Sequence, residues 1–429
     1  MKSRFQVHRG LSILIGMAFC APLQIWGQAD YMPPMSGWPA AIQTSWQIQG
    51  EYYGTQTNGA AILGAWLVSN GGNNYGLVIL PGGLVTIPGQ PNGGWNNTTR
   101  YQGATGPAPG ILNGKIFNVS TTTGGFIADS ITGVGEARTL YVHTATAAYI
   151  LQRVKRKSPT LGLKPSQVAV IPGGAGVVSY WDSATGTADL SKWVTRDNPP
   201  SVKYGYLYRG CGTAASFGTH LLHIEFLSCF NPTTGGQNRA NSGIYLQNHY
   251  ELQVLDAFGL AGAIDEYGAI YALRAPIVNA ELPPQVTLQT YDVYIVARSS
   301  GVFGDAVGAA TVTIYANGVL VQNATPMANI TPAGSATAGN GPLYLQNHNN
   351  EVVYNNIWVV PNATVTSLPY PSLLPAVSID SRYVIKPLLQ KQGLELLGFG
   401  GRHDMTGRKI RRNGAVLSVQ PSVLFSPKN

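Results

Sequence analysis

The chain has few charges, few cysteines and only a short apolar run at its start, and each shortage excludes a class of protein. Only 11% of its 429 residues are charged, whereas Gly (52) and Pro (28) are abundant. This composition is typical of short strands joined by turns, and of a secreted β-protein more than of a helical cytosolic enzyme. The chain has no Cys/His zinc spacing, phosphate-binding glycine loop or GxSxG elbow, which excludes several enzyme classes.

The apolar run at residues 11–19 is too short to cross a bilayer. It follows three basic residues and precedes a Gly-Gln-Ala sequence, which is the pattern of a cleaved signal peptide over residues 1–29. We therefore expect an exported protein without a membrane span, located in the periplasm, at the cell surface or outside the cell. Two cysteines remain after cleavage, Cys211 and Cys229, and the sequence leaves open whether they form a disulfide or two buried thiols.

The formal charge of +8 comes from the two ends of the chain. Residues 30–361 hold 15 Lys and Arg against 16 Asp and Glu, so the body is nearly neutral. A basic face for phosphates is not expected, and nucleic acid is excluded as a partner.

The sequence divides into five parts. Residues 30–157 predict a small β-domain, in which Gly, Asn and Pro clusters separate candidate strands such as 61–68, 75–80 and 139–151. The charged stretch at 152–165 predicts an exposed linker, and we assign 158–167 as the connection to a larger domain at 168–361. Residues 362–429 form a proline-containing connector and a basic tail.

Residues 239–256, RANSGIYLQNHYELQVLD, predict two strands joined at Asn248-His249 because apolar residues alternate with polar ones. Glu251 and Gln253 share one face of the second strand. Asp256 lies an odd number of positions after Glu251, so it shares that face only if a β-bulge at about 254–255 inserts a residue. A catalytic pairing of Glu251 with Asp256 therefore requires this bulge.

Six blocks of this chain resemble the 3-keto-disaccharide hydrolase family over about residues 168–361. They are NSGIYLQ, YELQVLDAFG, GAIYALRAPIVNAELPP, LQTYDV, NGVLVQN and GPLYLQNHNNEVVYNNIWVVP. The resemblance implies an all-β protein with a concanavalin-like jelly-roll β-sandwich after the smaller N-terminal β-domain. It also implies hydrolysis of glycosides that carry a ketone at C3. In relatives a tryptophan precedes the QTYD block, whereas this chain has Leu288.

The spacing Glu251-x-Gln253-x-x-Asp256 is similar to the acid-x-acid-x-x-acid pattern of laminarinase-like hydrolases on the same kind of sandwich, with the middle acid replaced. The predicted catalytic residues are Glu251, Asp256 and His249. The predicted substrate-binding residues are Arg239, Asn241, Tyr245, Gln253, Tyr271, Gln346 and His348. An enolate route is expected: Glu251 or His249 removes the C2 proton of a 3-keto sugar, a protonated Asp256 assists the leaving group, and water then adds.

Several alternatives remain open at this point. Glu251 and Asp256 could ligate a structural divalent metal such as Ca²⁺, which favours carboxylate and amide oxygens. The fold could serve a non-catalytic carbohydrate-binding module or a cell-surface structural protein. The tail block HDMTGRKI is similar to a type IX secretion sorting domain, which would make the secretion machinery a partner. On strand 220–227, His223 and Glu225 could face a cleft or a solvated surface.

Overall fold

The computed structural model describes residues 40–364, apart from gaps at 71–73, 85–105, 108–115, 119–123, 132–135, 144–145, 168–170, 173–175, 183, 285–287, 301–305 and 335–338. The predicted signal peptide and the basic tail lie outside the described residues. The regular secondary structure of the described part is almost all β-strand, as predicted, and none of its helices is long and apolar enough to cross a bilayer.

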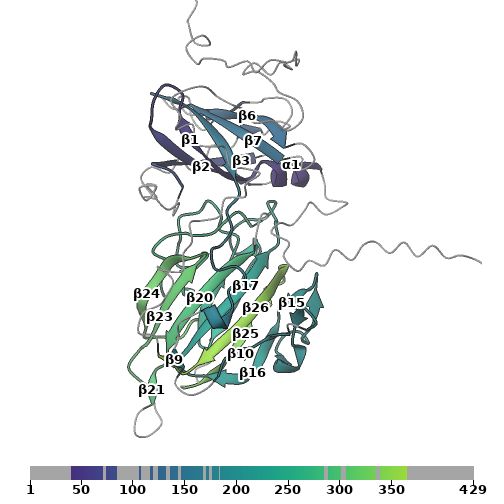
Figure 1. The fold of residues 1–429 in the computed structure, drawn as a ribbon, viewed down its shortest axis with the longest axis vertical. Helices are drawn as coiled ribbons and strands as arrows, with labels where there is room; N and C mark the ends of the chain where they lie inside the picture. Colours follow the sequence, from purple (N-terminus) through teal and green to yellow (C-terminus); the bar gives the residue numbers. More distant parts are fainter. Residues whose placement is uncertain are drawn as a thin grey trace, which may run out of the picture.

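The N-terminal part of the chain forms one antiparallel sheet of eight strands in the order β4-β3-β2-β1-β8-β7-β6-β5 (Figure 1). A single helix precedes it, α1 (Ala40–Ile48). The strands are β1 (Gly50–Gln56), β2 (Ile62–Ser69), β3 (Asn74–Pro81), β4 (Gly106–Pro107), β5 (Ile116–Asn118), β6 (Gly124–Ile131), β7 (Glu136–His143) and β8 (Ala148–Val154). The single strand predicted at 139–151 is wrong, because β7 and β8 are two paired strands.

The second part of the chain forms a sandwich of two antiparallel sheets. The larger sheet has the order β14-β15-β26-β17-β20-β23-β24, with β10 also paired to β26. Its strands are β10 (Val178–Ser179), β14 (Val202–Lys203), β15 (Tyr206–Tyr208), β17 (His220–Ser228), β20 (Gln289–Val296), β23 (Ala310–Ala316), β24 (Val319–Met327) and β26 (Val352–Pro361).

The smaller sheet has five strands in the order β13-β16-β25-β18-β19. They are β13 (Trp193–Thr195), β16 (Cys211–Phe217), β25 (Gly341–Leu345), β18 (Ser242–Leu246) and β19 (Tyr250–Val254). Two-stranded ribbons complete the fold: β11 (Trp181–Asp182) with β12 (Thr187–Ala188), β21 (Ser299–Ser300) with β22 (Ala306–Val307), and β27 (Ala363–Thr364) with β9 (Ile171–Pro172). In the described part of the chain, 3₁₀ turns cover Pro165–Gln167, Leu190–Lys192 and Gly236–Asn238.

The hydrophobic core lies between the two sheets of the sandwich. Alternate residues of β17, such as Leu222 and Ile224, meet alternate residues of β18 and β19, such as Ile244 and Leu252. Because side chains alternate along a strand, the residues between these core positions point to the outer faces. The outer face of the smaller sheet therefore displays the polar residues of the central hairpin.

One tight turn in the sandwich follows directly from its residue types. Asn317-Gly318 joins β23 to β24, both residues have positive φ, and Ala316 pairs directly with Val319. This is the geometry of a tight two-residue hairpin. Residues 267–272 form turns with isolated bridges at Ile270.

The linker was predicted to be exposed, and this is wrong. Arg153 and Arg156 are buried. Two nitrogens of the Arg156 guanidinium donate to the Glu51 carboxylate, Nε to Oε2 at 2.7 Å and the other to Oε1. Trp66 Nε1 donates to the same carboxylate at 3.1 Å. Arg156 is thus paired with an acid of β1 about a hundred residues earlier in the sequence, whereas Arg153 donates to the backbone carbonyls of Gln47 and Gln49.

The two cysteines are free thiols, Cys211 in the core and Cys229 half-buried. Burial raises the pKa of Cys211 to about 12 and that of Cys229 to about 11. The disulfide alternative is therefore excluded in this structure.

Candidate functional site

The central hairpin folds as the alternation predicts. β18 and β19 pair in one unbroken register from Ser242 opposite Val254 to Leu246 opposite Tyr250. A three-residue loop joins them, in which Gln247 and Asn248 take positive φ. The hairpin thus presents Tyr245 directly opposite Glu251, and Gly243 opposite Gln253, on the outer face of the smaller sheet.

Glu251 carries a carboxyl group with a raised pKa on this face. Its side chain is buried, and Tyr245 donates a hydrogen bond from its hydroxyl to Glu251 Oε2 at 2.7 Å. Burial raises the pKa of Glu251 to about 7, and the hydrogen bond from Tyr245 limits the rise. A carboxyl group with this pKa exchanges protons near neutral pH, as general acid-base catalysis requires.

The hairpin leaves room for this carboxyl group by means of a glycine. A Cβ atom on Gly243 would lie 2.3 Å from Glu251 Oε1, far inside normal contact distance. Glycine at position 243 therefore allows the carboxyl group to lie over β18. The sequence-based prediction did not identify Gly243 as part of the site.

A short chain of hydrogen bonds continues from Glu251 to the neighbouring strand. Gln346 donates from Nε2 to the Tyr245 hydroxyl at 3.2 Å, and this hydroxyl donates in turn to Glu251. The ring of Tyr344 packs against Tyr245 with centroids 5.2 Å apart, and its hydroxyl bonds Asp197. Tyr344 and Gln346 are half-buried, so they form the rim of this site.

A second group of amides lies beside Glu251. Gln253 is fully buried and donates from Nε2 to Gln237 Oε1 at 3.0 Å and to Asn241 Oδ1 at 3.4 Å. Asn241 donates to the carbonyl and the side chain of Gln237. These amides fix the loop that precedes β18 to the polar face.

Asp256 is not part of this group. β19 ends at Val254 and its pairing shows no bulge, so the predicted bulge at 254–255 is wrong. Asp256 Oδ2 instead accepts a hydrogen bond from Arg239 Nε at 2.7 Å, and the ion pair is buried. The strand alone separates Glu251 from Val254 by about 10 Å, so the carboxyl groups of Glu251 and Asp256 belong to two different sites.

Arg239 connects the two domains. Besides Asp256, its guanidinium donates to the Ser69 carbonyl at 3.0 Å and to Gln49 Oε1 at 3.4 Å, both in the N-terminal part of the chain. Arg239 was predicted to bind substrate at the catalytic site, but the structure places it in the domain interface.

The remaining predicted site residues take different positions. His249 is buried in the hairpin loop, and its carbonyl accepts from the Thr331 backbone N–H and hydroxyl. Tyr271 is half-buried, and its backbone N–H donates to the Glu251 carbonyl. His348 is exposed beyond β25.

The residues present do not fit the predicted calcium site. Among the described residues, no group of three or more His, Cys, Asp and Glu side chains is placed to hold a metal ion. Glu251 is bonded to a tyrosine and Asp256 to an arginine, so they do not share one cation.

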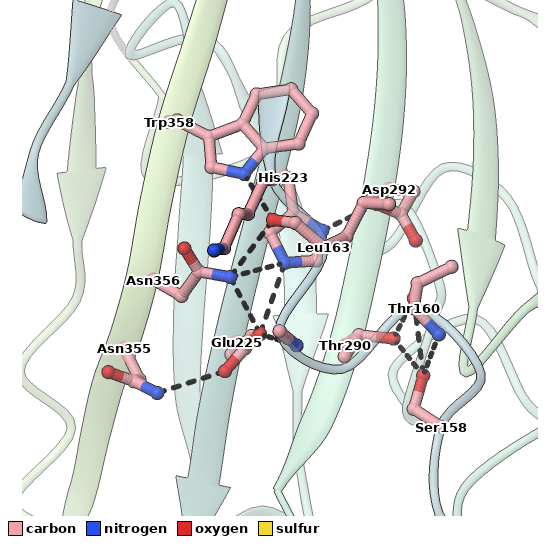
Figure 2. A network of polar contacts seen from close by, with 12 residues as sticks. Ser158, Thr160, Leu163, His223, Glu225, Thr290, Asp292, Asn355, Asn356 and Trp358 are labelled. Carbon is pink, nitrogen blue, oxygen red and sulfur yellow. Dashed lines mark hydrogen bonds and ion pairs between the residues drawn. The ribbon is translucent and has the colours of Figure 1, made fainter. Parts of the chain in front are cut away.

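A separate polar network lies on the outer face of the larger sheet, where the sequence placed His223 and Glu225 (Figure 2). Both are buried beneath residues 158–163, so neither a cleft nor a solvated surface is present there. His223 bonds Asp292 through Nδ1 at 2.6 Å and Glu225 through Nε2 at 3.3 Å. Burial opposes the imidazolium charge, but the two carboxylates outweigh it and raise the pKa of His223 to about 9.

Leu288 also lies on this outer side of the larger sheet, packed with Tyr206 and Val353. Its position is remote from the face that carries Glu251. The replacement of tryptophan by leucine there does not remove a stacking surface from the Glu251 site.

Comparisons with known proteins agree with the sequence blocks. No curated protein matches the chain. A candidate glycosyl hydrolase from Parabacteroides distasonis is 26% identical, with 44% of this chain and 93% of that chain covered and a TM-score of 0.37. Another candidate glycosyl hydrolase from that organism is 15% identical, covers 43% of this chain and 98% of its own, and has a TM-score of 0.31. Residues 178–360 match the family model of the 3-keto-alpha-glucoside-1,2-lyase-like domain, so this part of the chain is similar to the kind of family that its sequence blocks predicted.

Proposed function

We propose that this protein cleaves 3-keto-glycosides at the polar outer face of the smaller sheet, with Glu251 as the acid-base residue. The observation that supports this most strongly is the Glu251 carboxyl group, whose pKa burial raises to about 7 and which Tyr245 holds in place. It lies in the part of the chain that matches the 3-keto-alpha-glucoside-1,2-lyase-like family.

The chemistry requires one base rather than a pair of carboxylates. A ketone at C3 acidifies the C2 hydrogen, so Glu251 takes that proton and the C–H electron pair forms an enolate. The enolate collapses back to the ketone, a C1–C2 double bond forms, and the C1–O bond breaks. Protonated Glu251 then supplies the proton that the leaving oxygen needs. Water finally adds to the enone, with its oxygen at C1 and a proton at C2, which completes a net hydrolysis.

The position of Asp256 favours this route over ordinary retaining hydrolysis. A retaining glycosidase needs two carboxyl groups about 5–5.5 Å apart. Here the second acid is bound to Arg239 in the domain interface. A mechanism in which one residue first removes and then returns a proton needs no second acid at this distance.

The test is release of sugar from 3-ketotrehalose or a 3-keto-glucoside, measured with and without a chelator. We expect Glu251→Gln to lower kcat about 100-fold or more, since this is the scale of general acid-base catalysis. A matched control is Glu351→Gln, because Glu351 is a half-exposed glutamate paired with Lys203 on another surface. The same turnover in Glu251→Gln as in the wild type would refute the assignment.

The principal alternative is a carbohydrate-binding module on the same fold. The short chain of fixed amides and tyrosines around Glu251 would suit that role as well. Sugar binding without turnover, under every metal condition tested, would establish the binding module in place of the enzyme.

A further inference from the structure

A cavity of about 300 Å³ lies where the N-terminal sheet meets the sandwich. Val68 at the end of β2 and the following Asn70 form one side. The loop at residues 233–236, together with Phe258 and Leu260 after β19, forms the other. Its volume is at the lower end of the range for small-molecule sites, which occur preferentially between domains.

The packing around the cavity makes it a preformed feature. Trp66 packs on Phe258 with ring centroids 5.5 Å apart, and both rings are buried. Arg239 joins Asp256 on one side to the Ser69 carbonyl on the other. A ligand that enters therefore meets walls already held by apolar contact and a buried ion pair, which reduces the ordering cost of binding.

The chemistry of the lining selects a neutral ligand with both polar and apolar faces. Arg239 and Asp256 neutralise each other at 2.7 Å, so the cavity has no net charge to attract an ion. Asp256 Oδ1 accepts only a long 3.3 Å bond from the Phe258 N–H among the described residues, and a carboxylate oxygen accepts more than one hydrogen bond.

The rim adds further polar groups to an apolar floor. Thr233 and Thr234 contribute hydroxyls, Asn70 contributes an amide, and a Cβ atom added to either Gly235 or Gly236 would meet nothing within 4 Å. Across from them lie the hydrocarbon side chains of Val68 and Leu260. A sugar ring presents the same combination, since its C–H groups form an apolar face and its hydroxyls form a polar edge.

We propose that this interdomain cavity is a second carbohydrate site, which holds one pyranose unit of a neutral saccharide apart from the reacting group at Glu251. The Arg239–Asp256 pair acts in this site as a neutral hydrogen-bonding wall. The assignment does not depend on turnover at Glu251, because no residue of the central polar face lines the cavity.

Calorimetric titration of the full chain with D-glucose and with trehalose tests the proposal. Thr233→Trp places an indole at the rim, and we expect it to weaken sugar binding at this site at least about tenfold. Thr185→Trp is the matched control, since both threonines are exposed turn residues whose hydroxyls bond a side chain two or three residues earlier, Asn231 or Asp182. Glucose should also raise the unfolding temperature of the wild type and of Thr185→Trp more than that of Thr233→Trp.

Three outcomes would overturn the site: equal binding in Thr233→Trp and Thr185→Trp, no saturable binding of either sugar up to its solubility limit, or binding of inorganic phosphate in place of sugar. Titration of Glu251→Gln separates the two proposals. We expect it to retain binding at the interdomain cavity, so loss of turnover with retained binding supports both proposals, whereas retained turnover refutes the role of Glu251 alone.

Discussion

The Tyr245 hydroxyl lies 2.7 Å from Glu251 Oε2, and the two residues face each other directly across β18 and β19. The tyrosine therefore controls both the position and the proton affinity of the carboxyl group. Its hydrogen bond stabilises the charged carboxylate, while burial favours the neutral acid.

The pH dependence of turnover should follow this balance. Glu251 acts as a base only when deprotonated, so kcat/KM should rise with pH through about 7. Tyr245→Phe removes the hydrogen bond that lowers the pKa of Glu251, so the rising limb should move to higher pH. A pH profile of the variant with an unshifted limb would show that another group controls it.

Glu251 should also make the fold less stable at neutral and alkaline pH. Its pKa in the folded chain is raised from 4.5 to about 7, so the associated stability is present below pH 4.5 and is lost as pH rises through about 7. Glu251→Gln should be more stable than the wild type above this pH by up to roughly 3 kcal/mol. Chemical unfolding at several pH values measures this difference, and the two proteins should converge at low pH.

Gly243 should tolerate no side chain without a loss of function. Gly243→Ala would bring a methyl group to 2.3 Å from Glu251 Oε1 and push the carboxyl group away from its position. Turnover should fall, and the rising limb of the kcat/KM profile against pH should shift as well. Gly176→Ala is the control, because a Cβ atom at that position meets nothing within 4 Å. Equal activity in the two variants would show that the carboxyl group can move without consequence.

The interdomain ion pair should hold the N-terminal sheet to the sandwich. Arg239→Met leaves Asp256 buried without its partner, and breaking such a pair costs about 3–5 kcal/mol. We expect a lower unfolding midpoint and faster proteolysis between the domains. Lys192→Met is the control, since Lys192 and Asp189 form an ion pair whose side chains are 41% and 29% exposed. An Arg239→Met chain as stable as the control would place the domain contact elsewhere.

His223 should give the unfolding free energy a second pH dependence. Its raised pKa comes from neighbouring carboxylates, whereas that of Glu251 comes from burial. The pKa of His223 is raised from 6.5 to about 9, so the stability it contributes is fully present below pH 6.5 and is lost as pH rises through about 9. His223→Gln should lose this dependence, which amounts to at most roughly 3 kcal/mol in the wild type. Unfolding measured across this pH range tests it, and parallel curves for the two proteins would contradict it.

The parts of the fold that the sequence predicted well are those with local signals. Alternation located β17, β18 and β19, and Asn317-Gly318 located its hairpin, because these patterns act over a few residues. The division between β7 and β8 was missed because residues 144–147 contain no Gly, Pro, Asn or Asp. The helix α1 was not identified either: it has no acidic residue in its first turn and no basic residue in its last.

The candidate site was predictable in its position more than in its composition. Glu251, Tyr245 and Gln253 lie together because one hairpin carries them, whereas Asp256 depended on an irregularity that no local pattern specifies. Its partner Arg239 also bonds Ser69, 170 positions away, and no alternation pattern reports a contact of that kind. The charged linker was misassigned for the same reason, since Glu51 is distant in sequence from Arg156.

The segment Ser158–Leu163 has a practical consequence for dividing this protein. Thr290 Oγ1 bonds Ser158 and Thr160, Glu225 accepts from the Gly162 N–H, and Trp358 donates to the Leu163 carbonyl (Figure 2). A fragment trimmed to the family match at residue 178 would lack this strip and uncover His223, Glu225 and Asp292 together with the Trp358 ring. A fragment of this protein that keeps these side chains covered must therefore begin before Ser158, within the stretch 152–165 that the sequence predicts to be a linker.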